Sequence, residues 1–185
     1  MRFLISALTA GINSLAPAPP VRLQSTEEFL ALTPAALREH LRADFEERCY
    51  LFTGAVSTEL YDDACLFTDP TLSFRGVATF ERNLSALQPL LKALLATREV
   101  TLQDCTLVEE SGELQHGEAG IVVARWRMAA NISLPWRPRL DICGVTRFFF
   151  AEAEDGGRIV RYLESWDRPA VEALAQLVTP SRWAE

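Results

Sequence analysis

The sequence predicts an α+β domain in which helices precede a curved antiparallel sheet. Apolar residues recur with a period of 3.6 before Arg98 and with a period of 2 from Arg98 onward. The later runs are strand-like and follow one another through short turns, which is typical of antiparallel strands joined in sequence. Helices of such a domain cover one face of the sheet. A bent sheet wrapped over helices leaves a cone, and we expect its mouth to hold a small ligand.

The first helix is predicted over residues 34–49. Thr33 is its N-cap and Pro34 its first helical residue. Its apolar face consists of Leu37, Leu41, Phe45 and Cys49. After Gly54, we expect Ser57 to cap a second short helix that ends near Asp62.

A hairpin-like unit from Cys65 to Arg75 and a longer helix from Val77 to Ala96 come next. The longer helix has an inward apolar stripe made of Phe80, Leu84, Leu87, Leu91 and Leu94 or Leu95. Pro89 lies within it, so we expect a kink or a break there.

Four strands and a closing helix complete the domain. The strands are predicted over 98–109, Ile121–Leu134, Leu140–Ala151 and Arg158–Asp167, and the helix over Pro169–Val178. We divide the chain into an N-terminal leader or extension (1–33), one domain (34–180) and a C-terminal tail (181–185).

Composition excludes several functional classes. A net charge of −7 over 185 residues argues against a nucleic-acid binder, which would show a basic face. The four cysteines form no CxxC pair, so we expect no metal, no cofactor and no disulfide framework. No apolar run approaches the roughly 20 residues that span a bilayer.

The N-terminus allows three interpretations. Residues 1–26 contain Arg2 and Arg22 and no acidic residue, as in organelle-targeting leaders. A secretory signal is the second, although Pro17 directly after Ala16 spoils the obvious cleavage site. A poorly ordered tail is the third.

Asp69 is the first candidate for chemistry. It lies between Thr68 and Pro70 beside apolar residues, where lost hydration would raise its pKa and suit it to act as a base. Alternatively, Asp before Pro is ordinary turn chemistry, and its side chain caps its own backbone.

The order of YDDACLFTDP, FRG, GVTRFFF, DGGRI and ESWD resembles the NTF2-like superfamily, and within it SnoaL-like domains. LPWRPRLDICGVT and ALAQLVTP are similar to a narrower group of algal, plant and cyanobacterial domains (DUF2358-like). The resemblance covers about residues 35–180 and implies an NTF2-like cone. It also implies a small-molecule pocket, a possible dimer through the sheet face, and a plastid or cytoplasmic location. Because superfamily members are enzymes, carriers and adaptors, the fold leaves the function open.

Ketosteroid isomerases, which belong to this superfamily, carry a general base at the Asp before Pro of a YADDATVEDP-type segment. Asp69 falls on that position. Their oxyanion-binding Asp and Tyr correspond to Gly144 and a place near Phe45, which lack the donors. The resemblance therefore implies a possible base without the isomerase's oxyanion site.

Aromatic residues are the remaining candidates. We expect the pocket wall to include Phe45, Phe67, Phe74, Trp126, Phe148 and Trp166. Glu164 is expected on the outer sheet face, paired with an arginine. Trp136 and Arg137, in a loop stiffened by two prolines, suit a partner surface or a rigid corner. At least one phenylalanine of 148–150 is expected at a subunit interface.

Three functional hypotheses follow. The first is a protein that binds a hydrophobic small molecule such as a lipid, terpenoid or pigment. The second is an isomerase, cyclase or epoxide-opening enzyme with Asp69 as base and Tyr61 or Asp63 assisting. The third is an interaction or assembly factor that uses the Trp136 loop.

Overall fold

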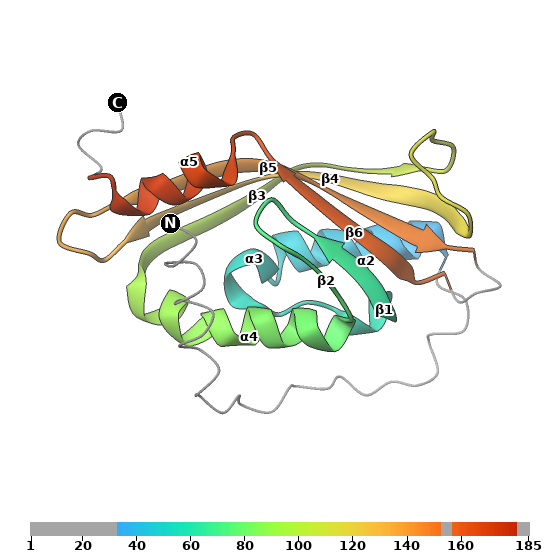
Figure 1. Ribbon diagram of the computed structural model, residues 1–185, viewed down its shortest axis with the longest axis horizontal. Helices are drawn as coiled ribbons and strands as arrows, with labels where there is room; N and C mark the ends of the chain where they lie inside the picture. The colour runs from blue at the N-terminus through green and yellow to red at the C-terminus, as the bar shows by residue number, and fades with distance from the viewer. Residues whose placement is uncertain (1–32, 153–156, 181–185) are drawn as a thin grey trace.

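The computed structural model describes residues 33–152 and 157–180, which form one curved, unclosed sheet with helices in its hollow (Figure 1). The sheet order is β2-β1-β6-β5-β4-β3. The strands are β1 (Tyr61–Thr68), β2 (Ser73–Arg75), β3 (Leu95–Val108), β4 (Glu118–Ile132), β5 (Arg139–Ala151) and β6 (Ile159–Trp166). All neighbours are antiparallel except β1 and β6, which are parallel. The predicted α+β class is confirmed.

Helix α2 (Pro34–Glu46) begins as predicted, because the Thr33 hydroxyl accepts the Ala36 N–H at 3.2 Å. The next segment forms α3 (Tyr50–Thr53) and a 3₁₀ helix, η1 (Thr58–Leu60), and β1 then begins at Tyr61. The predicted short helix after Ser57 is therefore present, but it ends at Leu60. Ser57 is its N-cap residue, but its side chain makes no capping bond, since its hydroxyl and its N–H both donate to the buried Asp44 carboxylate, at 2.8 and 3.1 Å.

Helix α4 (Val77–Leu94) runs through Pro89 as one helix, so the predicted break is not observed. Only Phe80 of its apolar stripe is buried. Leu87, predicted to face inward, is 37% exposed. The first half of α4 therefore covers the core, and the second half leaves apolar side chains uncovered.

Strands β3 to β6 form the predicted antiparallel meander, and their register aligns three rows of residues. One row places Phe148 opposite Tyr162, and Tyr162 opposite Phe67 of β1. In the next row Thr146 lies opposite Glu164. The third row centres on Gly144, which lies between Trp126 and Trp166.

The C-terminal helix α5 (Ala170–Ala175) and the 3₁₀ turn η3 (Gln176–Val178) lie along β5 (Figure 1). The Gln176 side-chain amide accepts the N–H of Asp141 at 2.7 Å and donates to its carbonyl at 3.1 Å. Gln176 thus satisfies the backbone groups of Asp141, which lies on β5 beyond the end of its neighbour β6.

The three phenylalanines 148–150 are all buried within the chain. On the convex side, the Arg161 guanidinium lies 3.4 Å from the centroid of the Phe149 ring. The prediction that one of them is left for a subunit interface is therefore wrong, because the chain covers all three itself.

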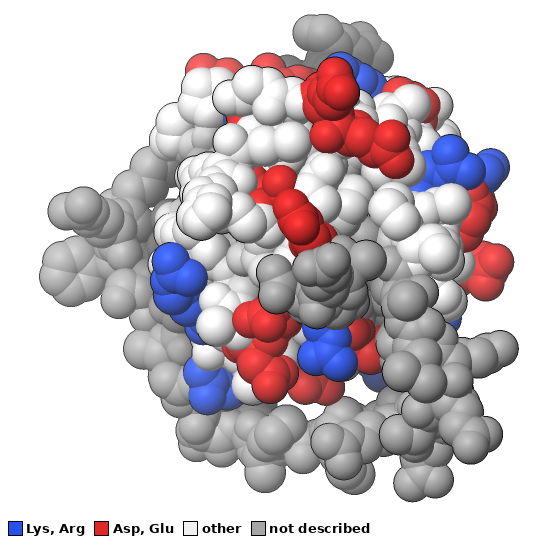
Figure 2. All heavy atoms as spheres, turned by 90° about the vertical axis from the view of Figure 1, so that its right-hand side faces the viewer, with Lys and Arg blue, Asp and Glu red and all other residues white. Residues whose placement is uncertain are grey.

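The proposed leader and the C-terminal tail lie outside the described residues, apart from Thr33. Among the described helices, none has the length and apolar character needed to cross a bilayer. The end of the molecule seen in Figure 2 carries more carboxylates than basic groups, in keeping with the net charge of −7.

Candidate functional site

Aromatic side chains fill the hollow between the sheet and the helices. The six residues predicted for the pocket wall lie here: Phe45, Phe67, Trp126 and Phe148 are buried, and Phe74 and Trp166 are half-buried against them. Phe67 stacks on Phe80 with ring centroids 4.2 Å apart. The six residues thus belong to one packed aromatic core, and their role as a pocket wall stays a prediction.

Two hollows of the described chain lie elsewhere. One of about 130 Å³ is lined by Arg139, Glu172, Ala175, Gln176 and Thr179. Another of about 220 Å³ is lined by Arg42, Glu46, Leu102, Gln103, Asp104 and Cys105. Neither includes an expected wall residue. Side chains therefore occupy the space where an open cavity was expected.

The Trp126 side chain fills the space beside Gly144, which has no side chain of its own. A Cβ at Gly144 would lie 2.3 Å from Trp126 Cζ2, so the indole lies directly on the glycine backbone. Trp126 is fully buried, and its Nε1 donates to Thr146 Oγ1 at 2.9 Å. The position that carries an oxyanion donor in ketosteroid isomerases is covered by an indole here.

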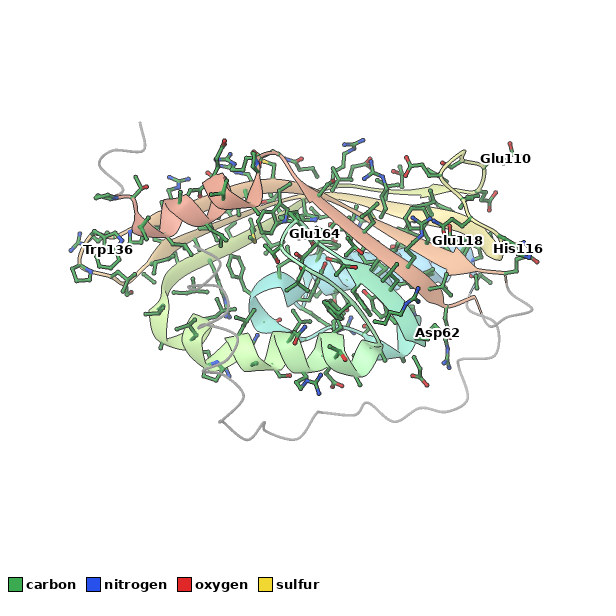
Figure 3. The ribbon with its side chains drawn as sticks, in the orientation of Figure 1. Asp62, Glu110, His116, Glu118, Trp136 and Glu164 are labelled. Atoms are coloured by element: carbon green, nitrogen blue, oxygen red, sulfur yellow. The ribbon has the colours of Figure 1, made fainter. Side chains whose placement is uncertain are left out.

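Glu164 is the centre of a polar network in this aromatic interior. Its Oε1 accepts from Trp166 Nε1 at 2.7 Å, and its Oε2 accepts a short hydrogen bond from the Tyr162 hydroxyl. The Tyr162 and Tyr50 hydroxyls are 3.2 Å apart. Figure 3 shows Glu164 near the middle of the molecule, far from Trp136 at one tip and His116 at the other.

Burial raises the pKa of Glu164, and the nearby Asp69 carboxylate raises it further. Hydrogen bonds from Tyr162, Trp166 and Thr146 act in the opposite direction without cancelling that effect. Burial, followed by the charge of Glu164, also raises the pKa of the Tyr50 and Tyr162 hydroxyls well above 10.0. Both tyrosines therefore remain protonated donors at neutral pH.

The expectation for Glu164 itself was wrong. It was placed on the outer face with an arginine, but it points into the core and forms no ion pair with any described Lys, Arg or His. Arg127 and Arg147, two of the arginines expected near Glu164, pair with Asp141 and Glu113 instead, and Arg161 pairs with Glu118 at 2.7 Å. No cluster of three metal-binding side chains occurs within residues 33–152 and 157–180.

Asp69 lies in the turn between β1 and β2. Its Oδ1 accepts from the Thr71 N–H at 2.6 Å, the Thr71 hydroxyl at 2.5 Å and the Leu72 N–H at 3.0 Å. This is the backbone-capping role that the sequence analysis gave as the alternative to a general base. Its neighbour Thr68 is paired with Leu163, the residue before Glu164, so the two carboxylates lie at the same end of β1 and β6.

Tyr61 and Asp63 lie away from this end. Tyr61 is buried against Phe67 and Phe80, and Asp63 is exposed. The β6 partners of Tyr61 and Thr68 are Ile159 and Leu163, so Tyr61 lies four β6 residues, about 13 Å, along the sheet from the neighbour of Asp69. The fold does not bring the proposed assistants to Asp69.

Trp136 and Arg137 are exposed in the loop between β4 and β5. Trp136 remains 40% exposed, although its Nε1 donates to the Leu177 carbonyl at 2.9 Å. Arg137 adopts a left-handed φ of 45°. The loop is thus a rigid corner that still presents part of an indole to solvent.

Comparison with known proteins gives the family. The family model described as "Uncharacterized conserved protein (DUF2358)" matches residues 35–161. The chain belongs to the DUF2358 family. No curated protein matches it.

Solved structures show that this DUF2358 protein has an NTF2-like fold. An NTF2-like protein of unknown function from Burkholderia pseudomallei K96243 is similar at a TM-score of 0.51 and 11% identity, over 81% of this chain and 99% of that one. An NTF2-like superfamily protein from Salmonella enterica serovar Typhimurium LT2 has a TM-score of 0.49 and 13% identity, over 75% and 96%. An LEH-like epoxide hydrolase of M. tuberculosis has a TM-score of 0.43 and 18% identity, over 78% and 96%. The predicted fold family is confirmed.

Proposed function

We propose that this protein binds a hydrophobic small molecule, such as a lipid, terpenoid or pigment, at the aromatic interior of its cone. One observation carries the proposal: a half-buried carboxylate, Glu164, lies among aromatic rings with no basic partner in the described chain. Burying an uncompensated carboxylate is costly, and a core that served packing alone would be more stable without it. Groups with perturbed pKa values gather at functional sites.

The ligand would enter beside the second half of α4. Leu87 is exposed there, and the half-buried Met128, Leu140 and Trp166 lie at the edge of the core. These side chains would offer apolar surface to a ligand. Because Trp126 and its neighbours fill the interior, the ligand would lie at this entrance, or Trp126 would move to admit it.

Catalysis is the second candidate function, favoured by the neighbouring positions of Asp69 and Glu164, which directly follow the paired residues Thr68 and Leu163. Two carboxylates in different surroundings are a common basis for acid–base chemistry. Asp69 would act as base in an isomerase, a cyclase or an epoxide hydrolase, using the oxygen Oδ2 that is not engaged in the turn. An Asp69→Asn variant with full turnover would remove this candidate.

Native mass spectrometry of the purified full-length chain, with organic extraction of what copurifies, tests the binding function. We expect a stoichiometric adduct that organic solvent releases and that the Glu164→Gln protein carries at lower occupancy. A clean apo mass, together with no binding of added apolar dyes, would contradict it.

A further inference from the structure

We propose that the site selects ligands whose polar end donates hydrogen bonds, an alcohol or an amine, and rejects those ending in an anion. The inference rests on the proposed binding function and names its ligand class. It follows from which groups face Glu164 and from the direction in which their hydrogen bonds run.

Every hydrogen bond that reaches Glu164 is donated to it. Trp166 Nε1 can only donate, so Oε1 must accept. Tyr162 donates to Oε2, which leaves the oxygen of its hydroxyl to accept from Tyr50 at 3.2 Å. The donors that face the carboxylate, Thr146 among them, are thus already used. A ligand carboxylate or phosphate would meet acceptors here, whereas a ligand O–H or N–H would find a carboxylate with unused lone pairs.

The charges around the site have the same sign. Asp69 and Glu164 directly follow the paired residues Thr68 and Leu163, so the Asp69 charge lies near Glu164, and the charge of Asp44, on α2, reaches Tyr50. The base nearest to Asp44, Arg48, is bound to that carboxylate and to Ser57. The other titratable groups that face Glu164 are the tyrosines Tyr50 and Tyr162, which are neutral. An anionic ligand end would therefore add a like charge to a desolvated site, which is strongly unfavourable.

The test uses three probes with the same ten-carbon chain and different ends: 1-decanol, decylamine and decanoate. At about pH 8 these are neutral, cationic and anionic, respectively. Isothermal titration calorimetry on the full-length protein, below the aggregation limit of each probe, gives the three dissociation constants. We expect decanol and decylamine to bind at least about tenfold more tightly than decanoate.

Two variants that each remove one negative charge test whether Glu164 causes the selectivity. In Glu164→Gln, the difference between decylamine and decanoate should shrink to about threefold or less, because the like charge is gone. In Glu172→Gln, on the exposed surface of α5, it should stay as in the wild type. The wild-type difference should also shrink as the pH falls and Glu164 takes up its proton.

Outcomes separate the two proposals. If decanoate binds as tightly as decylamine to the wild type, or if Glu164→Gln keeps the full difference, the selectivity is overturned and the binding function stands. If none of the three probes binds to the wild type, the binding function itself is overturned.

Discussion

Replacing Gly144 by alanine tests how tightly Trp126 fills the cone. The new methyl group would lie 2.3, 2.6 and 2.7 Å from Cζ2, Cη2 and Cε2 of the Trp126 indole. Real Cβ atoms do not approach other atoms so closely, so the indole must move. The indole is fully buried, and movement would break its 2.9 Å hydrogen bond to Thr146.

The cost has two parts. Overpacking a filled core costs about 1–3 kcal/mol, and the lost hydrogen bond about 1 kcal/mol. We expect Gly144→Ala to lower the free energy of unfolding by about 2–4 kcal/mol, measured by urea denaturation followed by circular dichroism. For a chain of this size, 3 kcal/mol corresponds to about 6–12 °C in Tm.

Gly112→Ala is the matched control, because no atom lies within 4 Å of a Cβ built at that glycine. Its unfolding free energy should stay within about 0.5 kcal/mol of the wild type. The cost of Gly144→Ala should fall by about 1 kcal/mol or more in a Trp126→Phe background, where a smaller ring leaves room. Equal stability of the Gly144 and Gly112 variants would refute the packing described here.

Four further predictions concern stability and titration. Burial raises the pKa of Glu164 above 4.5, so protonation of Glu164 stabilises the fold below about pH 4.5, and this stabilisation is lost as the pH rises through the folded-state pKa. Glu164→Gln cannot titrate, so its unfolding free energy in urea should increase relative to that of the wild type as the pH rises through that range. A difference in unfolding free energy that does not change with pH would contradict this. Tyr162→Phe removes a donor that lowers the pKa of Glu164, so it should raise that pKa further and cost about 1–3 kcal/mol; an unchanged titration of Glu164 would refute it. Asp44→Asn breaks the ion pair of a buried carboxylate with Arg48 and should lower the free energy of unfolding by about 2–4 kcal/mol. Glu46→Gln, in an exposed pair, should lower it by less than about 1 kcal/mol. Similar losses for the two variants in chemical denaturation would contradict the buried contacts of Asp44 with Arg48 and Ser57. Trp136→Ala loses one hydrogen bond to the C-terminal segment and should cost about 1 kcal/mol without changing probe binding in calorimetry; loss of binding would place the ligand at that loop instead.

Periodicity predicted most of the fold because the signals were local. The meander from β3 to β6 and the Thr33 cap of α2 follow from apolar alternation and from one hydroxyl at a helix start. The capping role of Ser57 was misjudged because Ser57 donates to Asp44, thirteen residues earlier. A long-range hydrogen bond of this kind leaves no local pattern.

The candidate site was only partly predictable. The aromatic residues expected at the wall could be named because large aromatic side chains are usually buried in a core. Glu164 could not be oriented, because alternation in β6 places it on the same face as Tyr162 and Trp166 without saying which face is inward. Tyr50 was missed, since it reaches Tyr162 across 112 residues of sequence.

The titration of Glu164 itself tests the central claim most directly. Protein labelled with ¹³C at glutamate carboxyl groups gives one signal per residue, and the signal absent from Glu164→Gln identifies this side chain. We predict a titration midpoint above the ordinary value of 4.5, because partial burial among aromatic rings, with no ion pair to a described cation, disfavours the charged form. A midpoint at or below 4.5 would show a solvated or ion-paired carboxylate and would contradict the interior site.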